Sequence, residues 1–289
     1  MEKLKPYLFL LPALFFVGCF LVYPALMTFS VSFSEWNGIN VSKMVGLDNY
    51  RFIFSDPAFW TAVRNTAIWV IGSLVFPVTL GLFAALLLYS LPGERFFKVL
   101  IFMPFALSGV VIAIVWSYMY KYEGAINTIL AGFTDKSHLQ PWLQIVPLNT
   151  FAMIFTYGWR MTGTNMVLFS VGMLAIPDEP IEAARMEGAR YLQILRKVII
   201  PMLSSTTAVV VVMAIINSLN IFDIIWIMTQ GGPYRSSATL GVNMYYESFL
   251  NFNFGRGAAN ATVLSIIVMA VSVFYLRVIF KKREIGGDS

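Results

Sequence analysis

Polar side chains interrupt two long apolar stretches of the sequence. In the stretch covering residues 198–228, Asn217, Asn220 and Asp223 recur every three residues. At that spacing they fall within a sector of about 120° on one side of a helix. Polar groups inside a membrane-crossing segment usually face a cavity or a partner helix. We therefore predict one polar stripe, whose amides and carboxylate can hydrogen-bond a polar solute or a neighbouring helix.

The other apolar stretch, residues 147–177, carries Tyr157, Arg160 and Thr164 on a shared helical face. A cation within the membrane needs an anion, and Asp223 is the one carboxylate inside any predicted span. We therefore predict an ion pair between Arg160 and Asp223. An anionic solute is the alternative partner for Arg160.

Residues for covalent chemistry are scarce. The chain has one cysteine, Cys19, and one histidine, His138. These numbers exclude a disulfide framework and a Cys/His metal cluster within the chain. We expect no catalytic residues, no metal ligands and no cofactor bound by this chain.

One charged segment, residues 178–197, separates the two apolar stretches. Pro177 ends the preceding stretch, Asp178 suits a helix N-cap and Pro180 suits the first helical turn. The composition that follows favours a helix, with Gly188 as its one weak point. We expect a helix, a glycine and a second helix along the membrane surface. A plain amphipathic interfacial helix would have the same composition.

Membrane spans are the elements that must position these residues. Of 289 residues, 58% are hydrophobic and 12% are charged, whereas about a quarter are charged in soluble globular proteins. A stretch of about 20 apolar residues can cross a bilayer. The sequence predicts an all-α membrane protein with six transmembrane helices, in which residues 1–289 form a single transmembrane domain. The predicted spans are residues 7–33, 66–91, 99–120, 148–176, 199–228 and 257–280.

The distribution of lysine and arginine indicates the orientation of these spans. Basic residues accumulate on the cytoplasmic side of a membrane protein. Twelve lysine and arginine residues lie in segments on the same side as the two termini. Seven lie on the other side, where the loops are longer. Both termini are therefore predicted to be cytoplasmic, as an even number of spans also requires. The net charge of +5 reflects this topology, and we expect no nucleic-acid partner.

The spacing within residues 178–201 resembles a family motif. An E-A-A triplet at residues 182–184, a glycine at 188 and V-I-I-P at 198–201 resemble the EAA loop of ATP-binding-cassette (ABC) importer permeases. In that family the loop is a coupling helix that sits in a cleft of the ATPase subunit. The resemblance implies coupling through Glu182, Ala183, Ala184 and Gly188, with Pro201 at the start of the fifth span. Because the sequence lacks a G-x-x-x-x-G-K-[ST] phosphate loop, ATP and Mg²⁺ are expected on a partner ATPase.

Two further segments resemble the carbohydrate-uptake permeases related to the maltose-transporter inner-membrane subunits, in particular the maltose-F-like ones. The first segment is residues 46–66. The second is residues 222–233, and it ends in Gly231, Gly232 and Pro233. The resemblance implies a heterodimer with a second homologous permease, two ATPase subunits and an extracytoplasmic sugar-binding protein, in the lipid of a bacterial or archaeal cell membrane. It also implies that the Gly-Gly-Pro turn contacts the binding protein, although such a turn can simply close a helix.

The resemblance thus implies the permease subunit of an ABC importer for a sugar or oligosaccharide, working by alternating access. Its substrate path would include Tyr157, Arg160, Thr164, Asn217, Asn220 and Asp223. A permease for glycerol phosphate or another polyol would share these patterns. A secondary transporter or channel would explain the spans but not the EAA spacing. An intramembrane enzyme is disfavoured because His138 falls in an outer loop and no nucleophile has an evident base.

Overall fold

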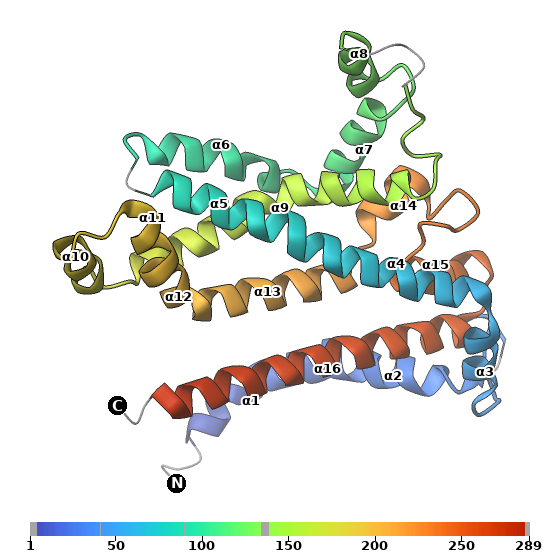
Figure 1. The fold of residues 1–289 in the computed structure, drawn as a ribbon. Helices are drawn as coiled ribbons and strands as arrows, with labels where there is room; N and C mark the ends of the chain where they lie inside the picture. Colours follow the sequence, from blue (N-terminus) through green and yellow to red (C-terminus); the bar gives the residue numbers. More distant parts are fainter. Residues whose placement is uncertain (1–4, 41, 90, 134–138, 287–289) are drawn as a thin grey trace. The chain divides into compact units, whose positions relative to one another are not determined.

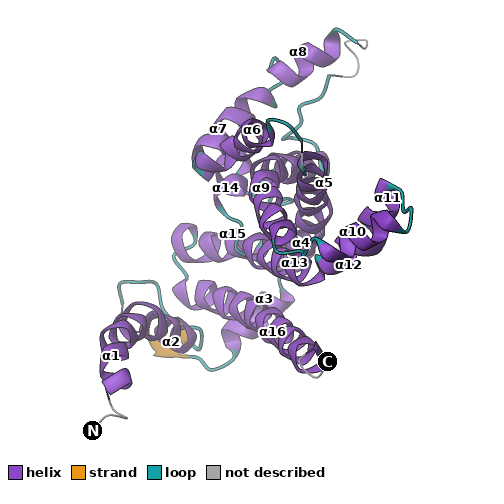
Figure 2. Cartoon of the chain, turned by 90° about the vertical axis from the view of Figure 1, so that its left-hand side faces the viewer, coloured by secondary structure: helices purple, strands orange, loops and turns teal. Residues whose placement is uncertain are grey.

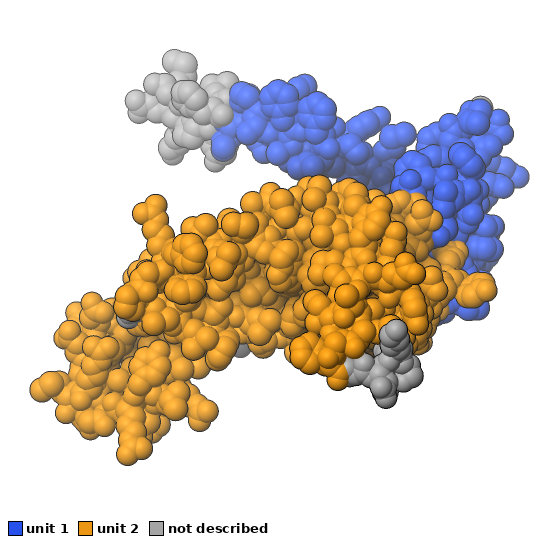
Figure 3. Space-filling model, turned by 90° about the horizontal axis from the view of Figure 1, so that it is seen from above, with its two compact units in different colours: residues 1–60, 240–267 blue, residues 61–239, 268–289 orange. Residues whose placement is uncertain are grey.

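The computed structural model describes residues 5–40, 42–89, 91–133 and 139–286. His138 lies outside the described residues. The described part is helical throughout, except for loops and one pair of two-residue strands (Figures 1 and 2). The chain divides into two compact units, coloured separately in Figure 3: unit 1 comprises residues 1–60 and 240–267, and unit 2 comprises residues 61–239 and 268–289. Whether they act as one transmembrane domain stays a prediction.

Unit 1 contains the first apolar helix and a folded loop that follows it. The Asn49 amide donates to the carbonyl oxygens of Ser32 and Ser34, at 2.9 Å each, and the Phe254 amide donates to the carbonyl of Trp36 at 2.8 Å. The Asn49 bonds hold the loop together, and the Phe254 bond ties it to the start of the last helix. The elements of unit 1 are α1 Lys5–Val17, a π-helical turn Gly18–Val22, α2 Tyr23–Val31, β1 Ser34–Glu35 paired antiparallel with β2 Lys43–Met44, α3 Asp48–Ser55, α15 Leu240–Tyr245, a π-helical turn Tyr246–Leu250 and the first part of α16 Phe254–Gly286.

Unit 2 is a helical bundle. After the first residues of α4 Pro57–Ser73, which belong to unit 1, it contains the rest of α4, a π-helical turn Leu74–Val78, α5 Thr79–Leu88, α6 Glu94–Ala106, α7 Gly109–Met119, α8 Ala125–Ala131, α9 Leu148–Leu174, α10 Glu179–Met186, α11 Tyr191–Ile194, a π-helical turn Leu195–Ile199, α12 Ile200–Met202, α13 Ser204–Leu219, α14 Asp223–Thr229 and the end of α16.

Helix α9 lies at the centre of unit 2 and packs against α5, α6 and α13 (Figure 1). Glycines on α9 permit the close approach that membrane helices use for packing. A Cβ atom at Gly163 would lie 2.5 Å from the carbonyl oxygen of Ile101 and 2.6 Å from the Cα of Phe102, both on α6. Gly158 and Gly172 of α9 are similarly covered by Phe76 and Thr206. The bundle therefore depends on small residues at its centre.

The predicted membrane spans are confirmed in part. Residues 10–31, 57–88 and 254–275 form helices long and apolar enough to cross a membrane, and two bent helix pairs raise the number of candidates among the described residues to five. The predicted span over residues 99–120 bends by 93° between α6 and α7. The bend falls at Leu107 and Ser108, where the backbone is extended and the Ser108 hydroxyl caps α7 by accepting from the Val111 amide.

The predicted span over residues 199–228 is not one continuous helix. It bends by 65° between α12 and α13, and it breaks again between Asn220, the C-cap of α13, and Asp223, the first residue of α14. The prediction that Asn217, Asn220 and Asp223 form a stripe along one helix is therefore wrong. Apolar composition continues across each break, so hydropathy alone does not reveal them.

Candidate functional site

The predicted order of helix, glycine and helix in residues 178–197 is confirmed: the structure has helix α10, Gly188 in the left-handed region at φ +78°, and helix α11. Its place along the membrane surface stays a prediction. The Ala189 amide donates to the carbonyl of Ala184, and the Gly188 amide donates to the carbonyl of Arg185, both at 3.0 Å. This pair of bonds is the Schellman motif, which places glycine four residues after the C3 position. The spacing between the E-A-A triplet and Gly188 is thus the spacing of a helix cap.

The start of α10 differs from the expectation. Asp178 is its N-cap residue, but the Asp178 backbone is already helical and its side chain accepts no capping hydrogen bond. Pro180 lies in the first turn, as predicted. The acidic Glu179 and Glu182 also lie there, where negative charge interacts favourably with the helix dipole.

Three isoleucines fix this segment to the bundle. Ile181, Ile194 and Ile199 are buried in one apolar cluster with Phe169 and Met173 of α9. Ala184 and Ala189 pack partly against the same cluster. The segment is therefore attached to α9 along one side, so a displacement of α10 would be transmitted to the core of unit 2.

The opposite side of the segment is exposed and partly apolar. Glu182, Ala183, Arg185 and Glu187 are exposed, and Met186 is 90% exposed. We call the exposed residues Glu182, Ala183, Met186, Tyr191 and Leu192 the α10–α11 edge. Exposed apolar groups rimmed by charges are typical of protein-binding surfaces. The sequence prediction missed Met186, although its spacing four residues after Glu182 places the two on one helix face.

The Gly231-Gly232-Pro233 turn is held in place by side chains from distant parts of unit 2. The Asn149 amide and the Ser237 hydroxyl both donate to the carbonyl of Gly232, at 2.9 and 2.8 Å. The Asn65 amide donates to the carbonyls of Ser236 and Ala238. The turn is therefore a fixed feature of the fold, as the purely structural explanation requires.

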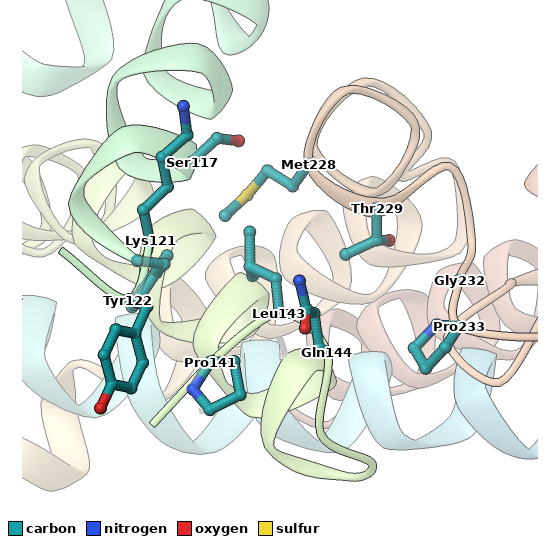
Figure 4. A pocket seen from close by; sticks show the side chains of 11 residues that line it. Ser117, Lys121, Tyr122, Pro141, Leu143, Gln144, Met228, Thr229, Gly232 and Pro233 are labelled. Atoms are coloured by element: carbon teal, nitrogen blue, oxygen red, sulfur yellow. The ribbon is translucent and has the colours of Figure 1, made fainter. Parts of the chain in front are cut away.

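A cavity of about 650 Å³ opens beside this turn. Figure 4 shows side chains from the end of α7, from the loop of residues 141–144 and from the end of α14 converging on it. Its lining combines aromatic, amide, hydroxyl and ammonium groups, and includes Tyr122, Gln144, Thr229, Lys121 and Pro233. Such a mixed lining suits a polar partner with some apolar surface.

The predicted substrate-path residues do not all line one site. Tyr157 and Thr164 of α9 and Asn217 of α13 line one small cavity. Asn217 and Asn220 are exposed on the surface of unit 2, and the Asn220 amide donates to the carbonyl of Ile216 at 2.9 Å. Arg160 and Asp223 do not line this cavity. The part that each residue plays in transport stays a prediction.

The predicted ion pair between Arg160 and Asp223 is wrong. Both residues are described, and the structure holds no salt bridge between them. The Arg160 guanidinium lies 5.4 Å from the centre of the Phe105 ring, and its buried Nε has no hydrogen-bond acceptor.

Asp223 is instead placed at helix N-termini. It is the first residue of α14, and its Oδ1 accepts from the Ile224 amide at 2.9 Å. Its carboxylate also covers Gly109, the first residue of α7. The N-terminal end of a helix carries partial positive charge. The N-termini of α7 and α14 therefore provide the positive charge near the Asp223 carboxylate that Arg160 was expected to provide. The sequence could not show this, because it depends on the breaks before α7 and α14.

The fold is that of an ABC importer permease: the chain superposes on a subunit in the crystal structure of a bacterial ABC transporter that imports the acidic polysaccharide alginate, with a TM-score of 0.83 over 96% of both chains. At 18% identity this likeness concerns the fold alone.

The chain belongs to the family described as binding-protein-dependent transport system inner membrane component, which it matches over residues 77–285. It is 34% identical to the osmoprotective compounds uptake permease of Synechocystis, over 96% of this chain and 99% of that one. It is 32% identical to the alpha-glucoside transport system permease of Rhizobium meliloti, over 99% of this chain and 85% of that one. The expectation of an integral membrane permease is therefore confirmed.

Proposed function

We propose that this chain is one of two permease subunits of an ATP-driven importer for a sugar or oligosaccharide. The observation that carries the proposal is the α10–α11 edge, which is exposed on one side and anchored by three isoleucines on the other. This arrangement suits a lever between a cytoplasmic ATPase and the membrane helices. ATP and Mg²⁺ would be held by the partner ATPase, and this chain would perform no covalent step.

The topology follows from the same arrangement. The five candidate spans become six if α9 also crosses the membrane. Its 27 residues extend about 40 Å, and its polar side chains are tolerated because neighbouring helices bury them. The start of α6 and the α10–α11 segment lie at one end of unit 2 (Figure 1). Arg95, Lys98, Arg185 and Arg190 lie in these segments and favour a cytoplasmic location for that end. With six spans, both termini would then be cytoplasmic too.

The exposed amides of Asn217 and Asn220 support a path along α13. A polar side chain facing lipid is costly, so it normally faces a cavity or another protein chain. We infer that this surface faces the second permease across a shared cavity. Amide groups there can hydrogen-bond sugar hydroxyls. The relationship to an alpha-glucoside permease supports a carbohydrate substrate.

The outer cavity beside Gly231, Gly232 and Pro233 would receive the substrate-binding protein. The turn is fixed by Asn65 and Asn149, so it offers a preformed surface. The Tyr234 side chain is fully exposed beside it, and exposed tyrosines are common in protein interfaces.

A second candidate substrate is anionic. Arg160 has a buried Nε without an acceptor and no salt bridge to Asp223, so an anion such as glycerol phosphate would find a cation here. If the substrate is anionic, Arg160→Gln should lower its uptake at least tenfold. If the substrate is neutral, its uptake by Arg160→Gln should fall far less.

The Schellman motif gives a direct test of the coupling segment. Gly188→Leu forces a branched side chain into the left-handed region, although no atom lies within 4 Å of the new Cβ. We expect a loss of ATP-driven uptake because the start of α11 is redirected, while membrane insertion is retained. Gly93→Leu is the matched control, since Gly93 has φ +77° and similarly open surroundings. Equal uptake by both variants would refute the role of Gly188.

Isolation from the native membrane tests the proposed assembly. We expect a mild detergent extract to contain this chain with a second permease, an ATPase and a binding protein, all identifiable by mass spectrometry. Ligand-induced thermal stabilisation of that binding protein would then identify the sugar or polyol. Recovery of the chain alone, together with uptake driven by an ion gradient, would instead support a secondary transporter.

A further inference from the structure

Between α4, α9 and α13 lies a cavity of about 20 Å³. Ser73 at the end of α4, Tyr157 and Thr164 of α9, and Asn217 of α13 contribute to its lining. All the residues that line the cavity belong to unit 2. The cavity is far too small for a sugar, so its own occupant must be smaller than the proposed substrate, although Tyr157, Thr164 and Asn217 are also residues of the predicted substrate path.

Three hydroxyl groups at this cavity have no hydrogen-bond partner. They are the Ser73 Oγ, the Tyr157 Oη and the Thr164 Oγ1, and each of these atoms is buried. Ser73 is 0% exposed and Tyr157 is 3% exposed. Buried polar groups in folded proteins are nearly always hydrogen-bonded, to protein or to ordered water. Three unpaired hydroxyls at one cavity therefore point to a shared ligand.

The neighbouring hydroxyl groups show that this arrangement is not forced by the helices. The Thr156 and Thr162 hydroxyls of α9 donate to the carbonyls of Ala152 and Gly158, at 3.1 and 2.7 Å. The usual bond to the carbonyl four residues earlier is thus available to a threonine on α9. Thr164, which lines the cavity, does not make this bond, and its buried hydroxyl has no partner.

We propose that this cavity is a binding site for one ordered water molecule, which bridges Ser73 of α4 to Tyr157 and Thr164 of α9. A water molecule needs about 10–15 Å³ of such space and two to four polar partners. The cavity supplies the space for one water, and the three hydroxyls supply the partners.

The water site adjoins an irregularity in the second span. Pro77 has no amide hydrogen to donate to the carbonyl four residues earlier, that of Ser73. The chain passes through the π-helical turn Leu74–Val78 at this point. The bridging water would therefore fasten the residue that precedes this turn to the central helix α9. A bridge of this kind links two helices without direct contact between their side chains.

High-resolution cryo-electron microscopy of the purified importer tests the site directly. We expect one density peak about 2.8 Å from both the Ser73 Oγ and the Tyr157 Oη. Well-ordered side chains with no such peak would overturn the proposal. So would a direct hydrogen bond between two of the three hydroxyls.

Thermal unfolding of variants provides an independent test. Ser73→Ala and Tyr157→Phe remove two partners of the same water, so the loss of Tm in the double variant should be smaller than the sum of the single losses. Ser73→Ala combined with Thr162→Val is the matched control and should be additive, because the Thr162 hydroxyl is paired with Gly158. Additive losses for Ser73→Ala and Tyr157→Phe would contradict a shared water.

Discussion

Replacing Met186 with aspartate should abolish ATP-driven uptake by the assembled importer while leaving the permease folded. Met186 is 90% exposed at the tip of α10 and makes no contribution to the buried cluster below it. A carboxylate introduced into an apolar contact must be desolvated without a partner, and loss of a central interface residue costs about 2 kcal/mol or more. Contact with the ATPase should therefore weaken by at least about 30-fold.

The measurement is ATP hydrolysis stimulated by the binding protein, together with uptake, in proteoliposomes. Met186→Leu is the control, since it keeps an apolar side chain of similar volume. We expect Met186→Leu to retain most of the activity. Full activity of Met186→Asp would show that α10 does not contact the ATPase through this edge.

Replacing Gly163 should loosen the packing of α6 against α9. A Cβ at this position meets backbone atoms of α6, at 2.5 Å from the Ile101 carbonyl oxygen and 2.6 Å from the Phe102 Cα. Backbone cannot move aside as a flexible side chain can, so α6 must separate from α9. Overpacking of this kind typically costs about 1–3 kcal/mol. Gly163→Ala should lower Tm by several degrees, and Gly163→Leu should leave little folded protein.

The control is another glycine within an apolar helical segment. Gly18 lies in the π-helical turn between α1 and α2, and a Cβ added there would meet no atom of another segment within 4 Å. Gly18→Ala should therefore leave Tm unchanged. Both variants can be compared by size-exclusion chromatography and thermal unfolding in detergent. Equal behaviour of Gly163→Ala and Gly18→Ala would refute close packing of α6 on α9.

The sequence predicts local features of this protein well. The helix, glycine and helix of residues 178–197 follow from capping and propensity within about 20 residues, and the structure confirms them. Apolar composition likewise predicts a membrane protein. The helix breaks at residues 107–108 and 220–222 leave no trace in hydropathy, because the residues on both sides remain apolar.

Features that join distant segments escape sequence reasoning. The Asn65 amide holds carbonyl groups more than 170 residues further along the chain, and no local pattern marks that pairing. The expected Arg160–Asp223 pair failed for a similar reason. The scarcity of carboxylates suggested Asp223 as the partner of Arg160, but the fold places the Asp223 carboxylate at two helix N-termini instead.

The central claim is that α10 contacts a cytoplasmic ATPase, and site-directed cross-linking tests it most directly. Because Cys19 is the one cysteine of the chain, a Cys19→Ser, Met186→Cys variant carries a single thiol at the tip of α10. In native membranes, a bifunctional reagent with one thiol-reactive end should link it to an ATP-binding-cassette ATPase, identified by mass spectrometry. The same reagent on Cys19→Ser, Tyr234→Cys should not link to the ATPase. Absence of the ATPase from the Met186→Cys products of an intact importer would contradict the account.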